Sequence, residues 1–390
     1  MRIAFVYDAL FPYVKGGAER RYHELARRLA AEHEVHCVTW QWWEGSATTT
    51  IDGITLHGVG TPPKLYGADG KRTVREAVAF ARRLAPALLG RRFDVIDCSA
   101  TPYVPLYAAA AAARLSGTPL VATWHEFWGE HWREYLPDRP AVARVAESLE
   151  ARAVRLGAAK VAVSPFTLRR MGLAAGDRSW VVPNGVDTTI GGPSTADARG
   201  GSWDVAFVGR LIDEKRVDRL IDAIGELRPI RPDLRCAIVG DGPARAELAD
   251  RAGSLDLADR VEFLGAVSET EARAVLEDAR LFVMPSEREG FGISVVEAQL
   301  AGAVPIVVRG PHTAAPELVR DGIDGALCDP EPASLAAMID GLLGAPDRLA
   351  AMRAAGRNAA LRFEWDDIAR QMLDVYEGVI ARDVALARAT

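Results

Sequence analysis

The stretch Ser286-Glu-Arg-Glu-Gly-Phe-Gly-Ile-Ser-Val-Val-Glu297 follows an apolar, strand-like run at residues 281–284 and leads into a helix-like run. It places one carboxylate, Glu289, before a Gly-Phe-Gly turn and a second, Glu297, in the first turn of the expected helix. The first backbone N–H groups of a helix are unpaired, and together with the helix dipole they favour a bound anion. The spacing therefore predicts a site that holds a phosphate between two carboxylates, each touching a different part of one ligand.

Short apolar strands alternate with amphipathic helices along almost the whole chain, a pattern typical of parallel sheets covered by helices on both faces. A capping box, Ser268-Glu-Thr-Glu271, marks the start of one of these helices. We therefore expect an α/β protein with doubly wound parallel sheets. The strand candidates are residues 3–7, 35–39, 95–98, 120–124, 161–163 and 180–182 in the first half, and 205–208, 236–239, 261–264, 281–284 and 304–307 in the second.

The chain has 390 residues, a length that favours two domains over a single core. Near residue 190 the apolar pattern stops, at Gly191-Gly-Pro-Ser-Thr195 and Arg199-Gly-Gly201, which reads as a linker. We predict a first domain over residues 1–187, a linker over 188–202 and a second domain over 203–364. Two similar sheets joined by a linker imply a cleft between domains, and ligands of such sheets bind beyond the carboxyl ends of the strands.

Composition excludes several classes of protein. Apolar residues make up 49% and charged residues 26% of the chain, which is typical of a soluble globular protein and not of a disordered or membrane-spanning one. The net charge of −6 argues against nucleic acid as the main partner. The apolar run that opens the chain is too short for a signal peptide, so we expect a cytoplasmic protein. Its cysteines show no metal-ligand spacing and are expected to be reduced; they are Cys37, Cys98, Cys236 and Cys328.

One segment, residues 64–92, departs from the acidic average. It carries eight basic residues against two acidic ones, Asp69 and Glu76. One interpretation is a solvated helix face. The other is a surface that makes peripheral contact with an anionic acceptor or with the inner face of a membrane.

Polar residues and glycines follow several of the expected strands. Gly209 and Arg210 come directly after residues 205–208, with Lys215 shortly beyond, and Gly240-Asp-Gly-Pro243 comes after 236–239. Glycines let a ligand approach the backbone, and the two cations could neutralise a diphosphate. In the first half, His125 follows residues 120–124, and the loop after 3–7 ends in Gly16-Gly17 just before a helix.

Taken together, these motifs resemble the retaining nucleotide-sugar glycosyltransferases of glycosyltransferase family 4. The resemblance covers nearly the whole chain and implies the GT-B fold, with two Rossmann-like domains facing a cleft. It also implies that residues 365–390 form a helix that packs back on the first domain. The motifs occur in the expected order: Gly16-Gly17, His125, Asn184-Gly-Val-Asp187, Gly209-Arg210 with Lys215, Gly240-Asp-Gly-Pro243, Phe263-Leu-Gly265, and Glu289-x7-Glu297 with Gly290-Phe-Gly292.

The resemblance assigns a role to each matching position. Glu297 would bind the ribose of the donor, and Glu289 would grip hydroxyls of the transferred sugar. Arg210 and Lys215 would hold the diphosphate, and His125 would lie near the sugar on the acceptor side. Backbone groups would complete the donor site at Gly16, Gly17, Gly209, Gly240, Leu264, Phe291, Gly292, Ile293 and Ser294. The family's usual glycine after the lysine is here Arg216, so the resemblance does not fix the conformation of that loop.

Structural explanations compete with these roles. Ser294 and Glu297 have the spacing of a capping box, so Glu297 could serve only the helix start. Glu289 could be a solvated loop carboxylate, His125 a core histidine, and Gly240 part of a tight turn. Three first-half tryptophans could pack in the core or could contact an acceptor; they are Trp124, Trp128 and Trp132.

The sequence thus predicts a retaining hexosyltransferase that moves sugar from a UDP- or GDP-sugar to an acceptor hydroxyl on a saccharide, a lipid-linked glycan or a small molecule. No cofactor is expected, and no metal, because the chain has no Asp-x-Asp motif. A nucleotide-sugar epimerase of the same fold and a non-catalytic sugar-nucleotide-binding protein remain as alternatives. A glycosidase is disfavoured by the spacing of the two glutamates, and a dinucleotide oxidoreductase because Arg245 stands where a third glycine would be needed.

Overall fold

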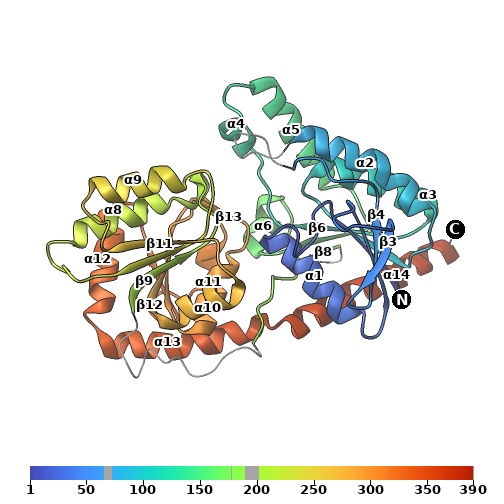
Figure 1. Ribbon diagram of the computed structural model, residues 1–390. Helices are drawn as coiled ribbons and strands as arrows, with labels where there is room; N and C mark the ends of the chain where they lie inside the picture. The colour runs from blue at the N-terminus through green and yellow to red at the C-terminus, as the bar shows by residue number, and fades with distance from the viewer. Residues whose placement is uncertain (66–72, 177, 189–201, 390) are drawn as a thin grey trace. The chain divides into compact units, whose positions relative to one another are not determined.

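The computed structural model describes residues 1–65, 73–176, 178–188 and 202–389 (Figure 1). The chain divides into two compact units, Met1–Gly185 with Trp365–Thr390, and Val186–Glu364. Each is built around a doubly wound, mainly parallel sheet, which confirms the predicted fold class. All but the two end residues of the expected linker, 188–202, lie outside the described part of the chain.

The first unit contains an eight-stranded sheet in the order β3-β4-β2-β1-β5-β6-β7-β8. Its neighbouring strands are parallel except for β3 and β4, which form an antiparallel hairpin at one edge. The strands are β1 (Arg2–Val6), β2 (Glu34–Thr39), β3 (Thr48–Ile51), β4 (Ile54–Gly58), β5 (Val95–Ser99), β6 (Leu120–Trp124), β7 (Ala159–Ala162) and β8 (Ser179–Val181).

The two faces of this sheet have separate cores, because successive side chains of a strand point to opposite faces. Ile3 and Phe5 of β1 pack with α1 (Gly17–Leu29) and α14 (Trp365–Ala389), whereas Ala4 and Val6 pack with α2 (Val74–Leu89) and α3 (Tyr103–Ser116). Helix α14 therefore belongs to the first unit although it ends the chain. The remaining helices of the unit are α4 (His131–Tyr135), α5 (Pro140–Ala153) and α6 (Pro165–Arg170).

The second unit contains a six-stranded parallel sheet in the order β11-β10-β9-β12-β14-β16. Helices α8, α9 and α12 supply the core on one face, and Figure 1 shows α10 and α11 on the other. A short ladder, β13 (Arg288–Glu289) with β15 (His312–Thr313), stands apart from the sheet. The other strands are β9 (Trp203–Val208), β10 (Cys236–Val239), β11 (Val261–Gly265), β12 (Ala279–Met284), β14 (Val304–Val308) and β16 (Ala326–Cys328). The helices are η1 (Asp213–Lys215), α8 (Val217–Leu227), α9 (Arg245–Ser254), α10 (Glu269–Asp278), α11 (Ile293–Ala301), η2 (Ala315–Leu318), α12 (Pro332–Leu343), α13 (Pro346–Ala360) and η3 (Leu361–Phe363).

In each sheet the strand order reverses at one point. In the second unit β9 lies between β10 and β12, so the chain winds away from β9 in both directions. In the first unit β1 lies between β2 and β5 in the same way. At such a point the loops that leave the carboxyl ends of the two central strands diverge, and ligands of open α/β sheets bind there. The loops after β9, β12 and β1 therefore define where to look for a site.

Candidate functional site

The loops after β9 and β12 bring Lys215 and Glu289 together. The Lys215 ammonium donates a hydrogen bond to the Glu289 carboxylate, and both side chains are largely buried. Lys215 ends the 3₁₀ turn η1, while Glu289 is held by β13, which pairs with Thr313 of β15. A backbone hydrogen bond of 3.0 Å, from Glu287 N–H to the Glu214 carbonyl, ties the same two loops. An ammonium and a carboxylate thus lie at the switch point of the sheet.

Arg216 takes the left-handed backbone conformation that a glycine would adopt more readily, with φ 50° and ψ 42°. Its guanidinium binds both carboxylate oxygens of Asp218, at 2.9 and 3.1 Å, and reaches Glu287 at 2.8 Å. The pKa of Arg216 is raised, first by the Asp218 hydrogen bonds and then by Glu287. The loop keeps a glycine-like shape without the family's glycine, because this side chain is anchored on both sides.

The Gly-Phe-Gly turn starts helix α11. Gly292 is the N-cap in a left-handed conformation, φ 97°, and no side chain caps the helix. A Cβ atom there would approach the Ala315 Cβ to 3.1 Å, a tighter contact than side chains usually make. Phe291 is buried against Phe363, with ring centroids 5.6 Å apart.

The start of α11 corrects one expectation about Glu297. Ser294 is the second residue of the helix and not its cap, so the capping-box explanation of Glu297 is wrong. Glu297 is half-buried and is the fifth residue of the helix, two positions further from its start than a capping box would place it. Ile293 and Ser294, by contrast, are the first two helical residues, where backbone N–H groups have no partner within the helix.

Glycines at the ends of β9 and β10 allow the neighbouring loops to pack closely. Gly240 has φ 134°, and a Cβ atom there would lie 1.8 Å from the Gly209 carbonyl oxygen. Gly240 N–H donates to the carbonyl of Gly265, at 2.8 Å, and Gly209 N–H to that of Val239, at 3.0 Å. Gly240 is therefore more than a turn residue, because no side chain fits there. Leu264 of β11 is half-buried at the same end of the sheet.

Arg210 directly follows Gly209 and is exposed. Within the described parts of the chain its guanidinium makes no hydrogen bond or ion pair. It is therefore a cation available to an anion at the carboxyl end of β9. Of the predicted donor residues, those from Gly209 to Glu297 all belong to the second unit, at or near the carboxyl ends of β9 to β12.

The other predicted residues lie in the first unit. Gly16 is the N-cap of α1 and Gly17 its first residue. His125 directly follows β6, and its ring lies 6.4 Å from that of Tyr7 and 5.8 Å from that of Tyr22. The pKa of His125 is lowered to about 3, because burial disfavours the imidazolium and Arg21 adds repulsion. The side chain is therefore neutral, and its Nε2 atom has no hydrogen-bond partner in the described structure.

Sequence reasoning missed a buried polar network beside His125. Asp97 of β5 accepts hydrogen bonds from Tyr22 (3.2 Å), Thr123 (2.7 Å) and Tyr376 of α14 (2.6 Å). Arg21 of α1 is 0% exposed, donates to the Pro183 carbonyl and contacts Asn184 Oδ1 at 3.2 Å. The signal was present, since Asp97 interrupts an apolar strand. The network joins α1, β5, β6 and α14, and it places Asn184 of the Asn-Gly motif.

The three tryptophans differ in exposure. Trp124 is 0% exposed and packs against Tyr103, so its use as an acceptor contact is corrected to core packing. Trp128 and Trp132 are half-buried, with ring centroids 4.6 Å apart. They do not share a helix, because α4 begins at His131. Both are held by the buried Glu150, which accepts from the Trp128 backbone N–H at 2.7 Å and from Trp132 Nε1 at 3.1 Å.

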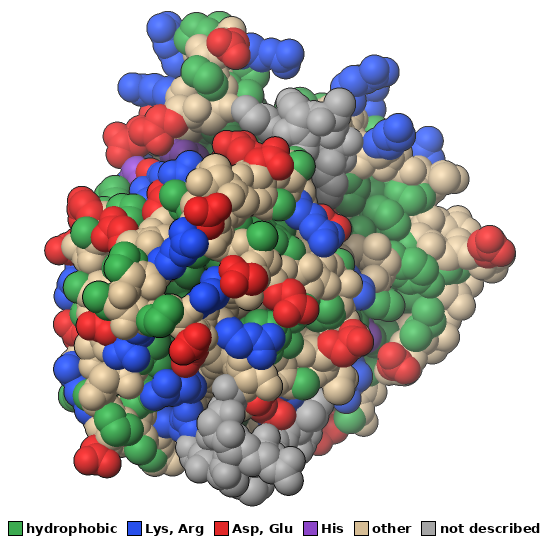
Figure 2. Space-filling view, turned by 60° about the vertical axis from the view of Figure 1, so that its left-hand side comes forward, with side chains coloured by type: hydrophobic (Ala, Val, Ile, Leu, Met, Phe, Trp, Pro, Cys, Tyr) green, Lys and Arg blue, Asp and Glu red, His purple; other side chains and the backbone are tan. Residues whose placement is uncertain are grey.

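The basic segment 64–92 is described only in part, since Lys71 and Arg72 lie outside the described residues. Glu76 is buried and bonds to Trp40 Nε1 at 2.6 Å, which leaves Arg75, Arg82 and Arg83 as the exposed charges of α2. Over most of the face that Figure 2 shows, basic and acidic side chains are interspersed. No helix in the described part of the chain is long and apolar enough to cross a membrane.

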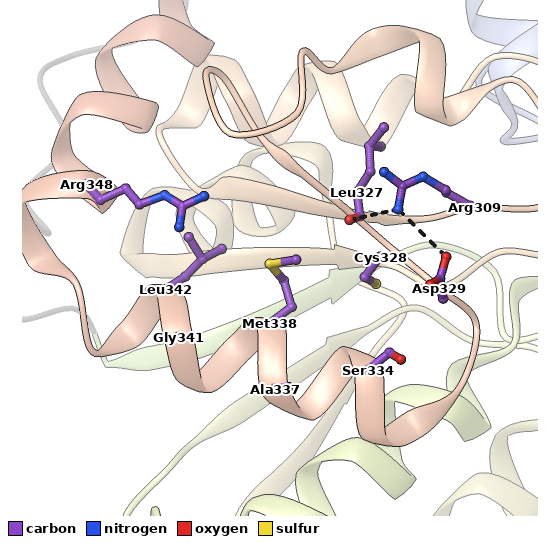
Figure 3. A pocket seen from close by; sticks show the side chains of 10 residues that line it. All are labelled: Arg309, Leu327, Cys328, Asp329, Ser334, Ala337, Met338, Gly341, Leu342 and Arg348. Atoms are coloured by element: carbon purple, nitrogen blue, oxygen red, sulfur yellow. Dashed lines mark hydrogen bonds and ion pairs between the residues drawn. The ribbon is translucent and has the colours of Figure 1, made fainter.

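Each unit contains a hollow. One, of about 430 Å³, lies beside the edge strand β16 and helix α12 (Figure 3). Its Arg309 is already engaged, donating to the Leu327 carbonyl at 3.2 Å and lying 3.7 Å from Asp329. The other, of about 380 Å³, lies beside α1 in the first unit. Among residues 1–65, 73–176, 178–188 and 202–389, no three His, Cys, Asp or Glu side chains gather as metal ligands would.

Comparisons with known structures define the class of fold. The structure is similar to sucrose-phosphate synthase from Thermosynechococcus elongatus, with TM-score 0.79 and 20% identity over 98% of this chain and 99% of the other. It is also similar to Anabaena Alr3699/HepE in complex with UDP-glucose, with TM-score 0.74 and 21% identity over 97% and 99% of the two chains. The fold is therefore GT-B, with two Rossmann-like domains.

Sequence comparisons give the family. Residues 15–190 match the family described as Glycosyltransferase Family 4, and residues 195–359 match Glycosyl transferases group 1. The chain is 30% identical over 387 residues to D-inositol 3-phosphate glycosyltransferase of Streptomyces scabiei, covering 93% of this chain and 86% of that protein. It is 35% identical over 236 residues to GDP-mannose-dependent alpha-(1-6)-phosphatidylinositol monomannoside mannosyltransferase of Mycolicibacterium smegmatis, covering 55% of this chain and 61% of that protein. The chain belongs to glycosyltransferase family 4, and it is a glycosyltransferase.

Proposed function

We propose that this enzyme transfers a hexosyl group from a UDP- or GDP-sugar to an acceptor hydroxyl, with retention of anomeric configuration. The observation that carries the proposal is the pairing of Lys215 with Glu289 at the switch point of the second sheet. The transferred sugar and its leaving diphosphate must be bound side by side, and this pair offers a carboxylate for hydroxyls next to an ammonium for phosphate oxygens. An ammonium has three donors, so Lys215 can bind a phosphate while still donating to Glu289.

The charge that develops during transfer explains the cations. Breaking the bond between sugar and phosphate leaves an oxocarbenium-like sugar and an anionic diphosphate. Arg210, exposed and unengaged by described residues, would stabilise that diphosphate together with Lys215 and the backbone N–H groups that open α11. In this proposal a donor phosphate oxygen accepts the proton of the attacking hydroxyl, which then bonds to the anomeric carbon on the face that the phosphate leaves.

The remaining donor contacts follow from position. Glu297, half-buried on α11, would accept hydrogen bonds from the ribose hydroxyls, and Leu264 at the end of β11 would meet the base. The neutral His125 would form one hydrogen bond with the transferred sugar through its unpartnered Nε2, as donor or acceptor according to its tautomer. No step of this mechanism uses a metal ion or a cofactor.

A cytoplasmic enzyme with peripheral membrane contact is part of the same proposal. The exposed charges of α2 that the structure describes are arginines, and such a face is attracted to anionic lipid. Co-sedimentation with vesicles that contain anionic lipid, lost at high salt and in an Arg75→Glu, Arg82→Glu double variant, would support this contact. Equal binding to neutral vesicles would contradict it.

One experiment tests the central proposal. The purified enzyme is screened by thermal shift against a panel of UDP- and GDP-sugars, because a ligand that binds the folded state raises the melting temperature. The stabilising donor is then incubated with candidate acceptors, with and without EDTA, and the anomeric configuration of the product is read by NMR. Retention in the presence of EDTA is expected. An isomeric nucleotide sugar formed from donor alone would indicate an epimerase, and binding without turnover a non-catalytic protein.

A further inference from the structure

The cavity of about 380 Å³ in the first unit has the size and lining of a ligand site. Binding pockets usually measure about 300–1,000 Å³ and are lined mainly by apolar and aromatic side chains with a few polar groups. This cavity lies between α1, the loop that follows β1, and strands β2 and β4. Its apolar walls include Phe5, Leu10, Phe11, Tyr22, Ile51 and Leu56.

The mouth of the cavity exposes large apolar side chains to solvent. Tyr13 is 49% exposed and Ile51 is 42% exposed, and both line it. Inside, the Phe11 ring lies 5.0 Å from that of His23. An apolar opening of this kind favours an apolar occupant, because the occupant and the walls leave water together.

The lining also sets the charge of the occupant. Among the described residues that line the cavity there is no lysine or arginine, and the acidic members are Glu19 and Asp52. An anionic group would therefore be repelled and would find no cation. Between apolar walls an unpaired charge of either sign is costly to bury, so the walls favour an uncharged group.

The polar end of the cavity adjoins the residues assigned to the acceptor side. The Tyr7 hydroxyl donates to Glu19 at 3.1 Å, and Tyr7 also lies 6.4 Å from the His125 ring. Glu19 lies close to the start of α1, since a Cβ atom on Gly16 would stand 2.4 Å from its carboxylate. Tyr7 and Glu19 therefore form a wall shared by the apolar cavity and the region around His125 and Gly16.

We propose that the acceptor is an amphiphile whose uncharged alkyl chain occupies this cavity, with its sugar or polyol head beside Tyr7 and His125. The inference rests on the proposed function for the identity of that head as the group that is glycosylated. The cavity suits an acceptor that carries an alkyl chain better than one that carries a second sugar. A saccharide needs many hydrogen-bond partners, and the walls of the cavity offer few.

The test uses methyl, hexyl and octyl β-D-glucopyranoside below their micelle concentrations, with binding measured by calorimetry. Each buried methylene should tighten binding about four-fold, until the cavity is filled. Ile51→Asp places a charge at the mouth, and Leu10→Trp fills the interior. Leu115→Asp on α3, where the side chain is 75% exposed, is the matched control outside the cavity. Circular dichroism confirms that each variant is folded.

The expected result is octyl binding at least ten-fold tighter than methyl binding in the wild type and in Leu115→Asp, with this gain lost in the two cavity variants. Equal affinity for the three glucosides would overturn the inference. A chain-length gain that survives in both cavity variants would also overturn it, because the chain would then bind elsewhere.

Donor turnover separates this inference from the proposed function. Octyl glucoside that binds in the cavity without being glycosylated by any UDP- or GDP-sugar would leave the cavity assignment standing and count against the proposed transfer. Methyl and octyl glucosides glycosylated with equal kcat/KM would support transfer and overturn the amphiphilic acceptor.

Discussion

The ammonium of Lys215 is hydrogen-bonded to the carboxylate of Glu289, across the two loops that leave neighbouring strands β9 and β12. From the sequence alone these residues were assigned to different parts of a donor, one to its diphosphate and one to its sugar. Their contact shows that the two assignments are compatible, because a sugar and its phosphate are bonded neighbours. It also gives each side chain a partner that orients it.

We therefore expect Lys215→Met to lower kcat/KM by two to three orders of magnitude, since removing a charge-stabilising donor typically costs about 2.7–4 kcal/mol in the transition state. Glu289→Gln should impair turnover as well, because it removes the charge that holds Lys215. Steady-state kinetics with the donor found by thermal shift measure both effects. Lys64→Met, an exposed lysine of the first unit, is the control. Near-normal turnover in Lys215→Met would remove the lysine from the mechanism.

At Arg216 the energetic cost of a left-handed backbone conformation is offset by side-chain contacts, and two substitutions can separate these contributions. A residue with a Cβ atom in the left-handed region costs about 1–2 kcal/mol relative to glycine. Arg216→Ala loses the contacts with Asp218 and Glu287 and keeps that cost, whereas Arg216→Gly loses both. We expect the free energy of unfolding of Arg216→Gly to lie within about 1 kcal/mol of the wild-type value. Arg216→Ala should be less stable than Arg216→Gly by about 1 kcal/mol. Urea denaturation measures the free energies of unfolding of both variants. Equal stability would mean that the loop relaxes to a backbone conformation that alanine adopts without cost.

The fold could be predicted from the sequence because its signals are local and repeat. Apolar strand runs, helical stripes and the capping box at Ser268 and Glu271 each depend on residues near in sequence, and the structure contains that capping box as expected. Strand order was not predictable in the same way. It depends on which strands pair, and residues 279–282 pair with 203–206 far away in the chain.

The candidate site was predictable where residue type alone limits what a position can do. Glycines at 240 and 292 indicated backbone conformations that residues with a side chain rarely adopt. Both have positive φ, 134° at Gly240 and 97° at Gly292. The capping-box explanation places the start of α11 two residues too late, because Ser294 has the right spacing for a cap and only the backbone shows that Gly292 takes this place. Glu150 and Asp97 were missed because their partners come from distant helices and strands.

Gly240 should be among the least replaceable residues of the second unit. In Gly240→Ala the new methyl group would have to displace the Gly209 carbonyl, and the backbone would keep φ 134°. We expect a loss of more than about 4 kcal/mol in the free energy of unfolding. Gly253→Ala is the matched control, because this helical glycine of α9 has nothing within 4 Å of its Cβ position and should be stabilised by about 0.5–1 kcal/mol. A mild effect in Gly240→Ala would show that the β10 loop moves freely.

One of the hydrogen bonds between helix α14 and the rest of the first unit can be removed almost without change of side-chain shape. The Tyr376 hydroxyl donates to Asp97 at 2.6 Å in a fully buried setting. Tyr376→Phe leaves the carboxylate with Tyr22 and Thr123 only, so we expect a loss of about 1–3 kcal/mol. Denaturation followed by tryptophan fluorescence measures it. Tyr13→Phe, at a 49% exposed position, should leave the free energy of unfolding nearly unchanged. An equal loss in both variants would mean that the hydrogen bond to Asp97 does not account for the effect of Tyr376→Phe.

The paired histidines of β2 and β4 should make stability depend on pH. His36 Nδ1 and His57 Nε2 lie 2.9 Å apart, and the pKa of His57 is lowered to about 4, first by burial and then by Arg91 and His36. Its ordinary pKa is about 6.5, so between these values the unfolded chain binds a proton that the folded chain does not. The free energy of unfolding should therefore fall as pH drops from about 6.5 to about 4, by about 3 kcal/mol at most for this group.

The comparison of two variants isolates that contribution. Burial also lowers the pKa of His36 and of His125, so the wild-type curve contains further terms of the same sign. His57→Gln removes only its own term, and we expect urea denaturation at several pH values to give a shallower decline below pH 6.5 than in the wild type or in the control His33→Gln. Because glutamine can replace a ring nitrogen as a hydrogen-bond partner, the curves of the variant and the wild type should nearly coincide at neutral pH. They should diverge as the pH falls below 6.5, where the wild type loses stability through His57 and the variant does not. Parallel curves over the whole range would mean that His57 is protonated as easily in the folded protein as in the unfolded chain.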